Sequence, residues 1–353
     1  MMVQHGSPWL LARSVRTIIG VMFLAGCALS PRTENAASAA AATADANLDV
    51  DHHRASAERQ ADDERLNQLK GEPFILRKVT VASLDGLAIP LYEFTPRQAP
   101  VQAALVWIYG GIHDRFGTNY LPFIREAVAR GYAVVAPEYR GAMGYGADFY
   151  DALDYGGGEV DDALAAAAYA IERYDLNSYR LGILGWSHGG LIALLAAAEA
   201  PERFGAIVAS VPVSNLVLRM ASKGPSYQAL FTGQEAYGAP VHRHRKPYVE
   251  RSPFYRVDDI SAPIHVQFAT NDDDVDWIEA QTLAYRLATM PNAEVLVFDS
   301  PPGGHYFNRS VDLETLQRKD TPEQIDSWNA INRFLDTHLL QPDELGSFIG
   351  VPN

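Results

Sequence analysis

One short stretch, Gly185-Trp186-Ser187-His188-Gly189-Gly190, limits the fold of this chain more than any other. Residues 180–184 before it are mostly apolar and predict a strand, and residues 191–200 after it are rich in helix formers. A strand, a G-x-S-x-G turn and a helix are typical of a nucleophile elbow, which projects a serine hydroxyl from the end of a sheet. We therefore expect Ser187 to be a nucleophile. The alternative is a glycine-rich turn that leads into a buried helix.

Strands and helices alternate on both sides of this stretch, which implies a mostly parallel sheet with helices on both faces. The sequence thus predicts an α/β-hydrolase fold with about eight strands. Residues 213–260 interrupt the alternation and predict a small cap over the site, and no repeat of four-stranded propeller blades is present. Strands are expected at residues 74–81, 87–93, 103–109, 132–138, 180–184, 206–211, 264–269 and 294–299, and helices at 121–130, 160–173, 191–200, 277–290 and 322–339.

The first 26 residues resemble a bacterial lipoprotein signal peptide. Arg13 and Arg16 precede a short apolar segment, and small residues stand directly before Cys27, the only cysteine. We expect cleavage before Cys27 and lipidation of its thiol, which would anchor the protein to a membrane of the bacterial cell envelope with its catalytic domain outside the cytoplasm. The alternative is an ordinary secretory peptide that is cleaved nearby.

Composition suggests how the rest of the chain is divided. Residues 27–65 are alanine-rich and then mixed in charge, which predicts a flexible tether; a single catalytic domain is expected at 66–341 and a tail at 342–353. The formal net charge of −14 argues against nucleic acid as a partner. No phosphate-binding or dinucleotide motif is present, so we expect no cofactor and no metal.

A nucleophilic serine needs a base, and the base needs an orienting acid. In α/β-hydrolases these residues follow the serine in the order acid, then histidine. His305 lies in a glycine-rich loop after the last expected strand, whereas His338, the other downstream histidine, falls in the last expected helix. Several acids crowd the loop after residue 269, namely Asp272, Asp273, Asp274 and Asp276.

These motifs resemble the catalytic domain of the prolyl oligopeptidase family. The resemblance rests on residues 185–190, 137–146, 159–162 and 251–260, and covers about residues 75–340. The family's acid motif, Gly-x-x-Asp-x-x-Val, matches residues 269–275 with alanine in place of glycine, and so selects Asp272. The resemblance implies a serine peptidase with the triad Ser187, Asp272 and His305. A carboxylesterase acting on small or sugar-linked esters would use the same triad, and a catalytically silent binding protein is a third alternative.

Two donors are expected to stabilise the oxyanion that forms during acyl transfer. One is the backbone N–H of His188, which follows the nucleophile. The family resemblance implies that the second is the hydroxyl of Tyr109, which stands directly before a glycine pair. A backbone N–H of Gly111 or Ile112 is the alternative donor, and Tyr109 would then be an aromatic residue at the edge of the core.

Overall fold

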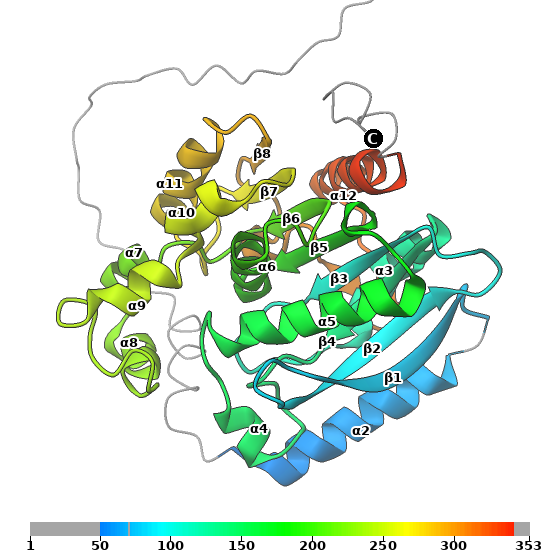
Figure 1. Ribbon diagram of the computed structural model, residues 1–353, viewed down its shortest axis with the longest axis horizontal. Coiled ribbons are helices and arrows are strands. Elements are labelled where there is room, and N and C mark those ends of the chain that lie inside the picture. The colour runs from blue at the N-terminus through cyan, green and yellow to red at the C-terminus, as the bar shows by residue number, and fades with distance from the viewer. Residues whose placement is uncertain (1–49, 70, 342–353) are drawn as a thin grey trace, which may run out of the picture. The chain divides into compact units, whose positions relative to one another are not determined.

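A computed structural model describes residues 50–69 and 71–341. Its main sheet has eight strands in the order β1-β2-β4-β3-β5-β6-β7-β8 (Figure 1). β1 pairs antiparallel with β2 and β2 with β4, and the remaining pairs are parallel. This arrangement confirms the expected α/β-hydrolase sheet. The strands are β1 (Phe74–Ala82), β2 (Ala88–Pro96), β3 (Ala103–Ile108), β4 (Tyr132–Pro137), β5 (Leu181–Trp186), β6 (Ala206–Ser210), β7 (Ile264–Ala269) and β8 (Ala293–Phe298).

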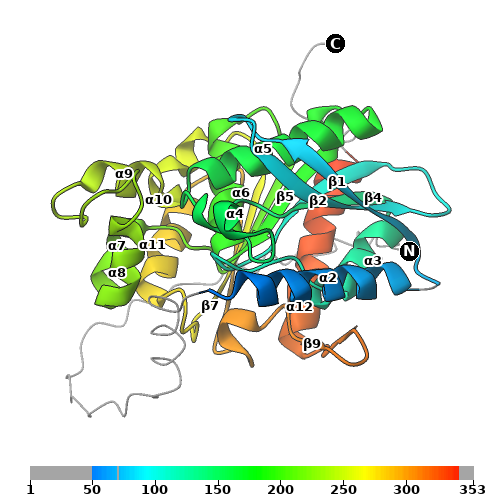
Figure 2. The same cartoon turned by 90° about the horizontal axis from the view of Figure 1, so that it is seen from below.

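Helices cover both faces of the sheet, and every residue of β3 to β7 is therefore buried. α5 (Gly158–Tyr174) and α6 (His188–Glu199) pack together on one face, and α3 (Leu121–Ala129) and α12 (Pro322–Leu335) lie on the other (Figures 1 and 2). The rings of Phe123 on α3 and Trp328 on α12 stack with their centroids 4.4 Å apart. α11 (Trp277–Leu287) packs against β7 and β8.

The interruption expected at residues 213–260 consists of short helices inserted between β6 and β7. They are α7 (Leu216–Ser222), α8 (Pro225–Thr232), α9 (Arg245–Glu250) and α10 (Pro253–Arg256). The first three form a group beside the sheet, and α10 packs on α6 (Figure 1). The smaller elements elsewhere are α4 (Ala147–Asp151) and the short hairpin of β9 (Val311–Asp312) and β10 (Gln317–Arg318).

The flexible tether expected at residues 27–65 is wrong for the last part of that range, because helix α2 (His52–Gln68) begins there. The helix lies beside β1 and β2 (Figures 1 and 2), with Leu66 in the core. Arg59 is only 2% exposed, and its side chain is so close to the turn at Gly144 that a Cβ there would lie 2.6 Å from the Cβ of Arg59. The sequence did not predict this helix because it lacks an apolar stripe, and the buried side chain of Arg59 makes much of its contact with the domain instead.

Two expectations fall outside the described residues: the signal peptide with Cys27, and the tail at 342–353. Among the helices of residues 50–69 and 71–341, none combines the length and apolar character needed to cross a bilayer.

Candidate active site

Ser187 occupies a sharp turn between β5 and α6. Its φ of 55° and ψ of −119° are strained values for a residue with a side chain. A Cβ on Gly185 would lie 2.1 Å from the carbonyl oxygen of Gly189, and a Cβ on Gly189 would lie 2.2 Å from that of Tyr109. Both positions therefore require glycine. The geometry is that of a nucleophile elbow, with the serine at the N-terminus of a helix whose dipole favours negative charge.

Asp272 and His305 come from two loops at the carboxyl ends of β7 and β8. The Nδ1 atom of His305 lies 2.8 Å and 3.0 Å from the two carboxylate oxygens of Asp272. Oδ1 of Asp272 also accepts the backbone N–H groups of Asp274 and Val275, at 2.9 Å and 2.8 Å. Both Asp272 and His305 are buried. Because the carboxylate faces Nδ1, it holds the imidazole in the orientation that leaves Nε2 free to accept a proton.

The His305 loop lies next to the elbow. The point at which Gly110 would carry a Cβ is 3.3 Å from the Cβ of Ser187 and 3.0 Å from Nη1 of Arg309. Arg309 follows His305 by four residues, and its Nη2 lies 3.5 Å from the His305 carbonyl oxygen. Within residues 50–69 and 71–341, no hydrogen bond joins the Ser187 hydroxyl to His305. Such bonds are often long without substrate and tighten when it binds.

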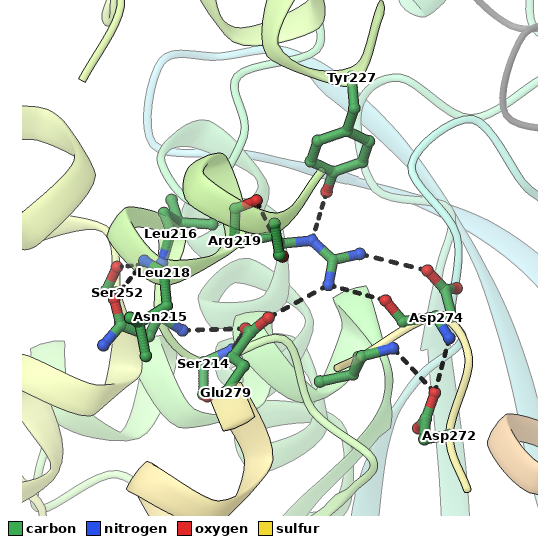
Figure 3. A network of polar contacts seen from close by, with 12 residues as sticks. Ser214, Asn215, Leu216, Leu218, Arg219, Tyr227, Ser252, Asp272, Asp274 and Glu279 are labelled. Carbon is green, nitrogen blue, oxygen red and sulfur yellow. Dashed lines mark hydrogen bonds and ion pairs between the residues drawn. The ribbon is translucent and has the colours of Figure 1, made fainter. Parts of the chain in front are cut away.

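A second acid, Asp274, faces the other nitrogen of His305. Its Oδ2 lies 3.5 Å from Nε2. Its Oδ1 lies 3.3 Å from Nη2 of Arg219, a contact drawn in Figure 3. Burial raises the pKa of Asp274, but the Arg219 guanidinium, together with the imidazolium of His305 when it is protonated, lowers it by more, and the net shift is downward. Asp274 is therefore ionised at neutral pH. Of the crowded acids, Asp272 faces Nδ1 of His305 and Asp274 faces Nε2.

Arg219 connects the inserted helices to the acid loop. It is 3% exposed, and it donates through Nε to the Tyr227 hydroxyl at 2.7 Å and through Nη1 to the carbonyl oxygen of Asp274 at 3.1 Å. Nη1 also lies 3.3 Å from Oε2 of Glu279, whose Oε1 accepts the N–H of Ser214 at 2.7 Å (Figure 3). The guanidinium therefore joins α7, α8, α11 and the Asp272 loop. Nothing in the local sequence around Arg219 indicated this role.

The oxyanion donors expected at Ser187 divide into backbone groups and a buried side chain. The N–H of His188 opens α6, and the His188 side chain is engaged elsewhere, with Nε2 2.8 Å from Oε1 of Glu159. The N–H groups of His188, Gly111 and Ile112 have no acceptor within residues 50–69 and 71–341. Gly111 adopts a φ of 95°, which turns this loop sharply.

Tyr109 is completely buried, and its ring stacks on that of Tyr139 at 4.5 Å. Its hydroxyl is enclosed and makes no well-formed hydrogen bond within the described part of the chain. Burial, followed by the charge of Glu138, raises the pKa of this hydroxyl far above its usual value. These contacts favour the interpretation of Tyr109 as a packed aromatic residue, and both possible second donors, its hydroxyl and a backbone N–H of Gly111 or Ile112, stay predictions.

His338, the alternative base, packs against Phe334 at the end of α12, with ring centroids 4.7 Å apart. Burial lowers its pKa. It is part of the apolar packing around α12, which leaves His305 as the histidine paired with an acid after β7.

Comparison with known proteins establishes the relationship of this chain. A model of the prolyl oligopeptidase family matches residues 121–321. The chain belongs to this family. Dipeptidyl aminopeptidase BIII of Pseudoxanthomonas mexicana is 30% identical over 310 residues, which cover 81% of this chain and 42% of the relative. The acylamino-acid-releasing enzyme of Rattus norvegicus is 25% identical over 232 residues, 64% of this chain and 32% of the relative.

Solved structures share the fold of this chain. A puromycin-hydrolyzing peptidase of Mycobacterium tuberculosis superimposes with a TM-score of 0.61 at 22% identity, over 75% of this chain and 40% of that protein. The chain thus spans less than half of the length of these relatives. The family resemblance expected from the motifs is confirmed, and it places the chain among serine-type hydrolases.

Proposed function

We propose that this member of the prolyl oligopeptidase family is a serine peptidase that cleaves peptide bonds through Ser187, His305 and Asp272. The observation that carries the proposal is the Asp272–His305 pair, in which Nδ1 and Oδ2 lie 2.8 Å apart and join two loops beside the strained serine. The names of relatives, an aminopeptidase and an acylamino-acid-releasing enzyme, favour peptide substrates over simple esters.

The geometry supports a conventional acyl-transfer sequence. The Ser187 hydroxyl attacks the carbonyl carbon of the substrate while Nε2 of His305 takes its proton, and Asp272 stabilises the imidazolium that forms. The N–H groups of His188 and of Gly111 or Ile112 stabilise the negative charge on the carbonyl oxygen, and each such donor contributes about 3 kcal/mol. His305 then protonates the leaving amine. Water, activated by His305, hydrolyses the acyl-enzyme and restores Ser187.

The proposal is tested by labelling and turnover. A fluorophosphonate probe should label the wild-type protein and Ser261→Ala, an exposed serine that serves as the matched control, but not Ser187→Ala. Labelling of Ser187→Ala equal to wild type would contradict the assignment, and an unlabelled wild type would favour a silent binding protein. Turnover of an aminoacyl p-nitroanilide, a blocked dipeptide amide and a p-nitrophenyl ester should then rank amides as substrates. Turnover of the ester alone would indicate a carboxylesterase.

We also propose that the protein is lipidated at Cys27 and anchored in the bacterial cell envelope. Support comes only from the order of basic, apolar and small residues before that cysteine. Mass spectrometry of the mature N-terminus should show a diacylated cysteine, and Cys27→Ser should lack it. An unmodified N-terminus at another residue would contradict this proposal.

A further inference from the structure

Arg309 places a positive charge beside the nucleophile. Its Nη1 and the Cβ of Ser187 both lie within 3.3 Å of the point at which Gly110 would carry a Cβ. Its guanidinium stands over the ring of Tyr306, 5.0 Å from the centroid, and the Tyr120 hydroxyl is a close polar neighbour. Its contacts with the Tyr306 ring and the His305 carbonyl oxygen thus hold the Arg309 side chain next to Gly110.

The Arg309 guanidinium forms no close ion pair within the part of the chain that the structure describes, although the charge of Asp114 interacts with it at longer range. Nε of Arg309 is enclosed without a hydrogen-bond partner, and within residues 50–69 and 71–341 the guanidinium forms no ion pair with a carboxylate. Asp114 is the acid whose charge responds to Arg309, but burial dominates there and raises the pKa of Asp114. Arg219, by contrast, uses its nitrogens on Tyr227, Asp274 and Glu279 (Figure 3). A partly buried guanidinium without an ion pair costs free energy, and an anion from outside the chain would lower this cost by pairing with it.

We propose that Arg309 forms a subsite for a carboxylate of the substrate, on the leaving-group side of the scissile bond. This inference rests on the proposed peptidase function. His305 gives its proton to the leaving amine, and Nη2 of Arg309 lies 3.5 Å from the carbonyl oxygen of His305, which is why the subsite is assigned to that half of the substrate. Arginine suits this task because its planar fork binds a carboxylate through two N–H groups.

The chemistry narrows the substrate class. When the leaving group is one or two residues long, its α-carboxylate lies near the scissile bond, and an acidic side chain in the first leaving residue would reach the same place. The protein would therefore favour short peptides with a free carboxyl terminus, or bonds followed by an acidic residue. A role for Arg309 at the oxyanion itself would instead affect all substrates alike, with no dependence on a substrate carboxylate.

Three substrates distinguish these possibilities: Ala-Ala-Ala, its carboxyl-terminal amide, and Ala-Glu-amide. We expect the wild type to show a kcat/KM for at least one carboxylate-bearing peptide that exceeds that for Ala-Ala-Ala-amide by about tenfold or more, mostly through KM. Arg309→Gln should reduce this ratio to about one, Arg309→Lys should restore part of it, and added salt should weaken it in the wild type. Arg333→Gln is the matched control, since it removes one surface charge at a side chain that is 64% exposed, and should keep the ratio.

Each outcome decides the inference. A preference for Ala-Ala-Ala would identify the terminal carboxylate as the group that Arg309 binds, and a preference for Ala-Glu-amide would identify an acidic side chain. Either result supports the subsite. Equal rates on all three peptides in the wild type, or a preference that survives Arg309→Gln, overturns it. An Arg309→Gln protein that fails to fold leaves the decision to the wild-type ratio, its salt dependence and Arg309→Lys. Loss of fluorophosphonate labelling in the wild type overturns the peptidase proposal itself, whereas normal labelling without a carboxylate preference overturns only the subsite.

Discussion

Replacing Arg59 by methionine should destabilise the protein in a strongly pH-dependent way. Nη1 of Arg59 donates to Oε1 of Glu138 at 3.0 Å and to the carbonyl oxygen of Phe116 at 2.5 Å. The two carboxylate oxygens of Glu138 accept the N–H of Phe116 at 3.3 Å and 3.2 Å. The pair therefore fixes α2 to the loop that follows Gly110 and Gly111. Both side chains are buried, so methionine would remove the cation and leave the carboxylate unpaired.

The magnitude follows from the protonation of Glu138. Burial raises its pKa to about 7, although Arg59 pulls in the opposite direction. In the unfolded chain this glutamate ionises near pH 4.5. Because its pKa is higher in the folded protein, protonated Glu138 stabilises the fold at low pH, and this stabilisation is lost as the pH rises from about 4.5 to about 7. Without Arg59 its folded pKa should rise further, and the variant should continue to lose about 1.4 kcal/mol per pH unit above about pH 7, where the wild type levels off.

The free energies of unfolding of wild type and Arg59→Met should therefore differ by about 1–2 kcal/mol near pH 5.5, where Glu138 is protonated in both folded proteins and the variant loses the hydrogen bonds of Arg59 and its ion pairs with the partly exposed Asp62 and Asp63. Near pH 9 the difference should reach about 3–5 kcal/mol. Urea denaturation at both pH values measures it. Arg54→Met, on the same helix with a side chain that is 76% exposed, is the control and should change stability by less than about 0.5 kcal/mol. A difference between wild type and Arg59→Met that is equal at both pH values would refute the reasoning.

Three other variants test the site. Asp272→Asn should lower kcat by about 10⁴ because it disturbs the tautomer and orientation of His305, whereas Asp274→Asn should lower it by less than about tenfold; the reverse order in steady-state kinetics would exchange their roles. Tyr109→Phe should change kcat by less than about threefold and the free energy of unfolding by less than about 1 kcal/mol, since the hydroxyl that it removes makes no well-formed hydrogen bond; a loss of kcat of about 10² would make that hydroxyl an oxyanion donor. Arg219→Met should destabilise the protein by about 3–5 kcal/mol because it leaves Glu279 buried without its cation, and chemical denaturation that shows less than about 1 kcal/mol would contradict this network.

The residues of the elbow determine their own local structure. Gly185 and Gly189 are required because backbone atoms only a few residues away in sequence, or on the neighbouring strand, occupy the space of a Cβ. Apolar runs likewise predict the buried strands β3 to β7, since burial on both faces of a sheet depends on residue type alone. The expected order of serine, acid and histidine came instead from the pattern of α/β-hydrolases, and the triad stays a prediction.

Tertiary structure decided which charged side chains meet. Arg59 and Glu138 are 79 residues apart, and Arg219 and Asp274 are 55 apart, so no periodicity in the sequence relates them. The helix that carries Arg59 looks like a solvated linker until the domain encloses its arginine. Asp272 and Asp274 face different nitrogens of His305, and Arg309 gains its place beside Ser187 from the turn after β8. Sequence determines local backbone geometry and burial, because these depend on neighbouring residues, whereas the pairing of charges depends on distances that exist only once the sheet has formed.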